Sequence, residues 1–255
     1  MPFEIYAARP DAVFVTLSGL GVTPPNGATH IDASFEKLGR MFEAMRDADV
    51  SEIVFAGGLE RPSLNPTKFD LKMMRLVPRL TQAFRAGDDA LLRTVIDIFE
   101  GDGFAVKGAH DIAPSLLDEA GWSAGPKPGK ALLSDAARAA EIIAVLSPMD
   151  VGQAVVVSGG HCLGIETMPG TDALLQFVAD TRGDHKGGVL AKLPKAGQEL
   201  RVDMPTIGPE TLRKAGAAGL SGIMVAGDAC LVLEKPKVEA MAREMGISVW
   251  TGDRP

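Results

Sequence analysis

A stretch in the last third of the chain combines one aspartate with several basic residues. It reads LAKLPKAGQELRVDMPTIGPETL, with Asp203 as the aspartate and Lys192, Lys195 and Arg201 ahead of it. Positive charge nearby favours the ionised carboxylate. Such a carboxylate can bind Mg²⁺ or orient a water molecule, while the cations hold phosphate oxygens. The simpler alternative is a surface salt bridge between Arg201 and Asp203, two residues apart on one face of a strand.

A pair of glycines, Gly57 and Gly58, follows an apolar run that we interpret as a strand. Glycine lets the backbone approach a ligand closely, and open α/β sheets bind ligands just past the carboxyl ends of their strands. An ordinary tight turn explains the pair equally well. The chain lacks the dinucleotide fingerprint G-x-G-x-x-G, because SGLGVTPPNG offers only Gly19 and Gly21 before two prolines.

Two predicted helix starts carry acids that either cap the helix or contact a ligand. Asp88 and Asp89 suit the positive end of a helix dipole and can cap it, and they could also bind a hard cation. In MPGTDALL, Thr171 is the expected N-cap, and the free N–H groups of this helix start could hold an anion. Glu166 and Asp172 flank that turn and could converge. Capping is the simpler interpretation for both starts.

The first half of the chain alternates between predicted strands and helices, which is typical of a parallel α/β sheet. We expect strands within 12–20, 51–58 and 104–110 and helices within 33–47, 70–85 and 87–104. Pro78 predicts a kink or a break in the second of these helices. The first helix has apolar residues at helical spacing, namely Leu38, Met41, Phe42 and Met45.

The second half mixes predicted hairpins with helices, which indicates a mixed sheet. Gly159-Gly160 marks the turn of a hairpin within 153–166, and a Gly-Asp pair marks that of a second hairpin within 222–234. The other expected elements are strands at 188–193 and 247–250 and helices at 134–147, 171–180, 209–218 and 235–246.

A stretch rich in glycine, proline and lysine, residues 121–134, separates the two halves and is typical of a domain boundary. We therefore predict an α/β protein of two domains. The first is a Rossmann-like parallel-sheet domain at 1–122, which a linker at 123–132 joins to a mixed-sheet α/β domain at 133–255.

The composition disfavours several classes of protein. A formal net charge of −7 argues against a nucleic-acid binder, and it means that an anionic substrate needs local cations, backbone N–H groups or a divalent metal. No apolar run approaches the roughly 20 residues of a membrane span, and the start lacks the basic region of a signal peptide, so we expect a cytoplasmic protein. Cys162 and Cys230 lie in apolar runs, so we expect two buried thiols.

Four stretches together resemble the LpxI-type UDP-2,3-diacylglucosamine pyrophosphatases of Gram-negative lipid A biosynthesis. They read GDDALLRTVIDIFEGDGF, DVGQAVVVSGG, PGTDALL and VLAKLPKAGQELRVDMPTIGPETL. The resemblance implies a two-domain hydrolase that holds a UDP-linked glycolipid between its domains and cleaves it to UMP and 2,3-diacylglucosamine 1-phosphate, or lipid X. It implies dependence on Mg²⁺, with Mn²⁺ as the alternative, and a homodimer. With this substrate we also expect peripheral contact with inner-membrane lipid.

The resemblance also implies roles for individual residues. In RVDMPTIG, which has Met204 where the family has leucine, Asp203 is implied to be catalytic and to bind the metal. The sequence leaves open whether it is a metal ligand or a general base. The residues implied to bind substrate come from the A-G-x-x-x-R-P loop, the K-x-P-K-x-G-Q block, the PGTD helix start and the RVDMPTIG motif. They are Gly57, Gly58, Arg61, Thr171, Asp172, Lys192, Lys195, Gln198, Arg201 and Thr206.

One difference from the family concerns the start of the chain. Members open with a strand and a glycine-rich turn resembling I-A-G-G-G-x-L-P, whereas this chain begins at what we interpret as the second strand, PFEIYAA. Either the start was assigned too far downstream or the first domain is incomplete. The alternative function is therefore a non-catalytic nucleotide- or lipid-binding member of the family. In FDLKMMRLVPRLTQAF, four apolar residues either contact lipid or belong to the core, namely Met73, Met74, Leu76 and Val77.

Overall fold

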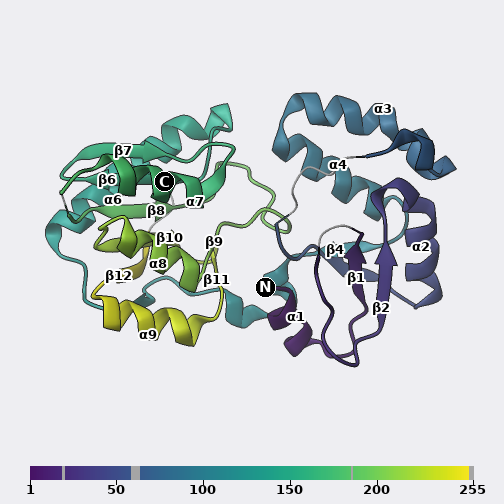
Figure 1. Cartoon of the computed structure of the whole chain (residues 1–255), viewed down its shortest axis with the longest axis horizontal. Helices are drawn as coiled ribbons and strands as arrows, with labels where there is room; N and C mark the ends of the chain where they lie inside the picture. Colours follow the sequence, from purple (N-terminus) through teal and green to yellow (C-terminus); the bar gives the residue numbers. More distant parts are fainter. Residues whose placement is uncertain (19–20, 59–63, 185, 253–255) are drawn as a thin grey trace. The chain divides into compact units, whose positions relative to one another are not determined.

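The computed structural model describes residues 1–18, 21–58, 64–184 and 186–252. The chain divides into two compact units, unit 1 at Met1–Pro114 and unit 2 at Ser115–Pro255 (Figure 1). The division lies ahead of the predicted linker at 123–132. Part of that stretch is a strand of unit 2, because Ser123 and Ala124 pair with the last strand of the chain.

Strands and helices alternate along most of unit 1, as the sequence predicts. Its strands pair in parallel as two separate two-stranded sheets among the described residues, β1 with β2 and β3 with β4. Its elements are α1 (Pro2–Ala8), β1 (Phe14–Leu17), β2 (His30–Ala33), α2 (Leu38–Asp47), β3 (Glu52–Val54), α3 (Leu71–Ala86), α4 (Asp88–Glu100), β4 (Ala105–Lys107) and α5 (Ala109–Ile112).

The core of unit 1 follows from the helical spacing in α2. All four apolar residues of the predicted stripe are buried, and Phe42 is fully enclosed. The Phe42 ring meets Phe99 of α4 edge to face at 4.9 Å between centroids and Phe104 at 5.6 Å. Aromatic pairs of this kind bury much apolar area, so α2 and α4 are held together by one cluster.

Three expectations for unit 1 are wrong. PFEIYAA forms the helix α1 rather than a strand, because Pro2 suits a first helical turn and Ile5 is buried on one side. Pro78 does not break α3, which continues from Leu71 to Ala86, so of the predicted kink or break the break is wrong. Gly87 holds the N-cap position of α4, and the Asp89 carboxylate does not cap the helix but pairs with Arg93 one turn later, at 2.7 Å; the side chain of Asp88 lies outside the described part of the chain.

Unit 2 is a six-stranded mixed sheet with helices on both faces (Figure 1). The strand order is β5-β12-β10-β8-β6-β7, in which β12, β10 and β8 run parallel and β5, β6 and β7 are antiparallel to their neighbours. Its elements are β5 (Ser123–Ala124), α6 (Lys130–Leu146), β6 (Ala154–Ser158), β7 (His161–Ile165), α7 (Gly170–Thr181), β8 (Val189–Lys192), β9 (Thr206–Ile207), α8 (Pro209–Ala217), β10 (Gly222–Ala226), β11 (Leu231–Val232), α9 (Lys235–Met245) and β12 (Ser248–Gly252).

Alternate strand residues of unit 2 pack into two apolar clusters. On one face, Val155 and Val157 of β6 meet Ile143 of α6. On the other face, Val156 and Leu190 pack with α7, α8 and α9. Both faces of this sheet are therefore covered, as expected where buried parallel strands read as continuous apolar runs.

The first predicted hairpin is confirmed and the second is wrong. β6 and β7 join through Gly159 and Gly160, which both have positive φ, at 57° and 81°. β10 does not pair with β11, because β8 and β12 already occupy both of its edges. β11 pairs in parallel with β9 in a separate two-stranded sheet. α6 starts at Lys130 with Gly129 as N-cap, so Ser134 lies inside the helix and does not cap it.

Among the described residues, none of the helices has the length and apolar character needed to cross a membrane.

Candidate functional site

The stretch around Asp203 forms the loop that connects β8 to β9. Lys192 is the last residue of β8 and pairs with Val225 near the end of the parallel strand β10. β6 runs the opposite way and begins beside Lys192, at Ala154. The loop therefore lies at the carboxyl edge of the parallel strands, where open α/β sheets bind ligands.

Lys192 ties the end of β8 to the start of β9. Its side chain is almost fully buried, and its ammonium donates a hydrogen bond to the Thr206 carbonyl oxygen at 3.0 Å. The Thr206 hydroxyl donates to the carbonyl oxygen of Met204, also at 3.0 Å. These contacts fix both ends of the loop that carries Asp203.

Gln198 is the centre of the hydrogen bonds within the loop. Its amide nitrogen donates to the Asp203 carboxylate at 2.6 Å and to the Asp203 carbonyl oxygen at 2.5 Å. The same nitrogen lies 3.0 Å from the amide oxygen of Gln153, and the Gln198 oxygen accepts the Lys195 backbone N–H at 2.7 Å. One side-chain amide thus fixes the backbone and the carboxylate of Asp203 together.

The cations of the loop have acidic partners. The Lys195 ammonium pairs with Asp150, and the Arg201 guanidinium forms two bonds of 2.9 Å to the two carboxylate oxygens of Glu199. The alternative of a salt bridge between Arg201 and Asp203 assumed that both lie on one face of a strand, and that assumption is wrong. Residues 199–203 form a turn, in which the Asp203 N–H donates to the Glu199 carbonyl oxygen at 3.0 Å.

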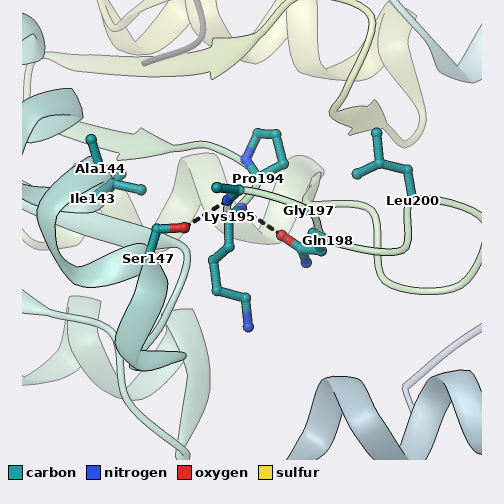
Figure 2. Close-up of a pocket in the computed structure, with 9 residues that line it drawn as sticks. Ile143, Ala144, Ser147, Pro194, Lys195, Gly197, Gln198 and Leu200 are labelled. Atoms are coloured by element: carbon teal, nitrogen blue, oxygen red, sulfur yellow. Dashed lines mark hydrogen bonds between the residues drawn. The ribbon is translucent and has the colours of Figure 1, made fainter.

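A cavity of about 280 Å³ lies between α6 and the first part of the loop (Figure 2). The Ala196 N–H closes onto the Ser147 hydroxyl oxygen at 2.6 Å, and the dashed bonds of Figure 2 show this contact beside the one from Lys195 to Gln198. The lining mixes apolar side chains with these polar groups, and it comprises Ile143, Ala144, Ser147, Pro194, Lys195, Ala196, Gly197, Gln198 and Leu200.

Two predicted site residues lie at the start of α7. Thr171 is not the N-cap of α7, because Pro169 holds that position. The Thr171 hydroxyl instead donates a hydrogen bond to the Glu166 carboxylate at 3.1 Å. The Asp172 carboxylate pairs with Lys214 of α8 at 2.6 Å. Glu166 and Asp172 therefore have different partners and do not form the converging pair that the sequence suggested.

The predicted glycine turn belongs to unit 1. Gly57 follows β3 with φ of +109°, a conformation that favours glycine, and space is open where a Cβ would stand on Gly57 or Gly58. Arg61 lies outside the described residues. A role in substrate binding stays a prediction for all three residues.

The two cysteines differ in burial. Cys230 is buried as predicted, and burial raises the pKa of its thiol to about 12 even though the charge of Lys192 acts in the opposite direction. A thiol that stays protonated is a poor nucleophile or metal ligand. Cys162 is exposed, contrary to expectation, because β7 is an edge strand of the sheet.

The sequence does not predict which residues of the segment before β6 contact the loop. Asp150 pairs with Lys195, Gln153 contacts Gln198, and Ser147 contacts the Ala196 N–H. DVGQ precedes a predicted strand, but only the antiparallel pairing of β6 with β8 brings it to the loop. Glu199 lies within the stretch itself, and the spacing of two residues from Arg201 is the signal that indicates this pair.

Comparison with known proteins covers both units. Residues 6–116 match the family model described as the LpxI N-terminal domain, and residues 119–250 match the LpxI C-terminal domain. The UDP-2,3-diacylglucosamine pyrophosphatase LpxI of Caulobacter vibrioides is 37% identical over 224 residues, which cover 86% of this chain and 80% of that protein.

Proposed function

The chain belongs to the LpxI family, and we propose that it hydrolyses the pyrophosphate bond of UDP-2,3-diacylglucosamine to UMP and 2,3-diacylglucosamine 1-phosphate. The observation that carries the proposal is the Asp203 carboxylate, which Gln198 holds in the loop at the carboxyl edge of β8, in a stretch that also carries Lys192, Lys195 and Arg201. The name of the Caulobacter vibrioides relative supports the substrate and the bond that is cleaved.

In the proposed reaction, water attacks one phosphorus and the bond from that phosphorus to the bridging oxygen breaks. Two phosphate monoesters result, and the proton of the attacking water must be removed. Asp203 would either accept that proton as a general base or bind the metal as a ligand. A carboxylate held in a fixed position suits both roles. Lys192 and Arg201 supply positive charge for the phosphate oxygens.

The charges of the loop bear on how a pyrophosphate binds. The three basic side chains are balanced by three acids, namely Asp150, Glu199 and Asp203. A phosphate group would have to replace Asp150 at Lys195, or Glu199 at Arg201, or share these cations with them. A site without surplus positive charge, in a protein of net charge −7, needs additional positive charge to hold a pyrophosphate.

We propose that Mg²⁺ supplies this charge, with Mn²⁺ as the alternative. Within the described part of the chain, no group of three acidic, histidine or cysteine side chains could hold a metal by itself. Mg²⁺ in phosphoryl-transfer sites commonly takes one or two carboxylates together with substrate phosphates and waters, and Asp203 fits that donor set. When bound, such an ion would neutralise phosphate oxygens and lower the pKa of a bound water.

The function is tested by following UMP release from UDP-2,3-diacylglucosamine with purified protein. We expect turnover with Mg²⁺, a loss of turnover in EDTA, and its return when excess Mg²⁺ is added. Binding of UDP or of the lipid product by calorimetry without any hydrolysis in Mg²⁺ or Mn²⁺ would instead favour a non-catalytic binding member of the family.

We further propose a homodimer that contacts the inner-membrane surface. The dimer rests on the family resemblance. The membrane contact rests on the proposed substrate, whose two acyl chains place it in lipid. Sedimentation equilibrium should give twice the monomer mass, and a monomer at micromolar concentration would contradict the dimer.

A further inference from the structure

Helix α3 of unit 1 differs in charge from the rest of the protein. Its 16 residues, LKMMRLVPRLTQAFRA, include four basic and no acidic side chains, whereas the whole chain has a net charge of −7. A local excess of one sign against the overall charge indicates a surface that attracts the opposite sign.

The inner face of α3 is ordinary core. Met73 and Ala83 are buried, and Leu76, Val77 and Leu80 pack against the cluster around Phe42. The alternative that Met73 contacts lipid is therefore wrong, because this side chain belongs to the core.

The outer face of α3 has a different composition. Its residues recur at i, i+3, i+4, i+7 and i+14 and so lie on one side of the helix. They include Leu71, Met74, Arg75, Pro78 and Arg85, with the exposed polar residues Thr81 and Gln82 between the last two, and we call this side of the helix the α3 outer face. Leu71 is 70% exposed and Met74 is 50% exposed. Two large apolar side chains on the solvent side of a basic helix are unexplained by packing.

The basic residues of this face are not neutralised within the protein. Among the described residues, Arg75 and Arg85 form no ion pair with a carboxylate. By contrast, Arg79, on the flank of the helix, pairs with Asp97 at 2.6 Å. The charges of Arg75 and Arg85 are therefore available to an external anion.

A hollow of about 650 Å³ continues this face between α2 and the start of α3. Four basic residues line it together with two acids, and Leu71 and Met74 stand on the α3 side; the basic residues are Arg40, Arg46, Lys72 and Arg75, and the acids are Glu43 and Asp70. Arg46 and Lys72 share Asp102 as a partner. The hollow thus combines clustered cations with exposed apolar side chains at its edge.

We propose that the α3 outer face docks the protein on an anionic phospholipid surface. Lipid phosphates would meet the arginines, while Leu71 and Met74 enter the boundary between headgroups and acyl chains. Basic residues interleaved with large apolar ones on one helix face are typical of segments that lie in a membrane interface. A purely electrostatic partner such as a nucleic acid would not account for the exposed apolar pair. The inference depends on unit 1 alone and not on the reaction.

Co-sedimentation with substrate-free vesicles tests the docking. We expect binding to vesicles of phosphatidylcholine mixed with phosphatidylglycerol, little binding to phosphatidylcholine alone, and weakening as salt rises. The double variant Arg75→Glu with Arg85→Glu should lower the vesicle affinity about tenfold or more. A control double variant with the same change of charge, Arg138→Glu with Arg243→Glu in unit 2, should bind as the unchanged protein does.

The apolar contribution is tested separately. Leu71→Ser with Met74→Ser should weaken binding to the same vesicles, whereas Val145→Ser with Met149→Ser, which changes equally exposed apolar residues of unit 2, should not. Circular dichroism melting curves confirm that each variant is folded. Equal binding by both charge variants, or equal binding to charged and neutral vesicles, would overturn the proposal. Vesicle binding that survives while UMP release is absent would sink the proposed function alone.

Discussion

The basic side chains of the loop in unit 2 and those of α3 in unit 1 differ in their partners. In the loop, Lys195 pairs with Asp150 and Arg201 with Glu199. On the α3 outer face, Arg75 and Arg85 have no carboxylate partner among the described residues, and Arg75 lies one turn from exposed Leu71. Paired cations stabilise one arrangement of a loop, whereas unpaired cations are available to a partner from outside.

The loop has further features of an organised site. Its central acid, Asp203, receives two hydrogen bonds from one amide, and Lys192 at the end of β8 is almost fully buried. Groups held in this way need little reorganisation during a reaction. Under our two proposals, unit 2 carries the chemistry and the α3 outer face attaches the protein to a lipid surface.

The largest effect is expected when the acid of the loop is neutralised. Asp203→Asn should lower UMP release roughly 10³-fold or more, because the substituted amide can neither accept a proton nor carry charge to a metal. Vesicle binding should stay unchanged, since α3 is untouched. Asp180→Asn, a change to an exposed acid of α7, serves as the control. Turnover like that of the unchanged protein in the Asp203 variant would contradict the assigned role.

A smaller effect is expected at the residue that holds this acid. The sequence predicted that Gln198 binds substrate, but its hydrogen bonds indicate that it positions Asp203. Gln198→Ala should lower kcat about 10- to 100-fold with KM changed by less than about threefold. Gln176→Ala, which removes an exposed amide bonded to Asp180, should change neither. A raised KM with unchanged kcat would show that Gln198 binds substrate instead.

The smallest effect concerns the interior beneath the loop. Burial holds the pKa of Cys230 at about 12 in the folded protein, against 9.0 for an ordinary thiol. Above about pH 9 the unfolded chain loses this proton and the folded protein keeps it. The free energy of unfolding should therefore fall by up to about 1.4 kcal/mol per pH unit from pH 9 towards 12.

Cys230→Ala should remove this slope in denaturant titrations, whereas Cys162→Ser should keep it. In the folded protein at about pH 8, iodoacetamide should label exposed Cys162 and leave Cys230 unmodified. Equal labelling of both thiols, or a slope that persists without Cys230, would mean that the interior beneath the loop is open to water.

The sequence alone predicts the features that depend on neighbouring residues. The apolar spacing of α2 placed Phe42 in the core, and Gly159-Gly160 located a hairpin turn, because helical period and turn chemistry are read within a few residues. The presence of Lys195 and Asp203 on one loop, directly after Lys192, was likewise predictable, because these residues lie close together in the sequence.

Other features were decided by contacts between distant segments. β11 pairs with β9 because both edges of β10 are already occupied, and no local pattern contains that information. Burial of one face of α3 left Leu71 and Arg75 facing outwards, and only the packing around Phe42 determines which face is covered.

The sequence by itself therefore determined the alternation of strands and helices and the residue types around Asp203. The tertiary structure decided what Asp203 and its neighbouring cations contact. Gln153 and Asp150 reach the loop only because β6 lies antiparallel beside β8. Strand pairing and burial depend on residues far apart in the chain, so the environment of this carboxylate is a property of the folded unit and not of its motif.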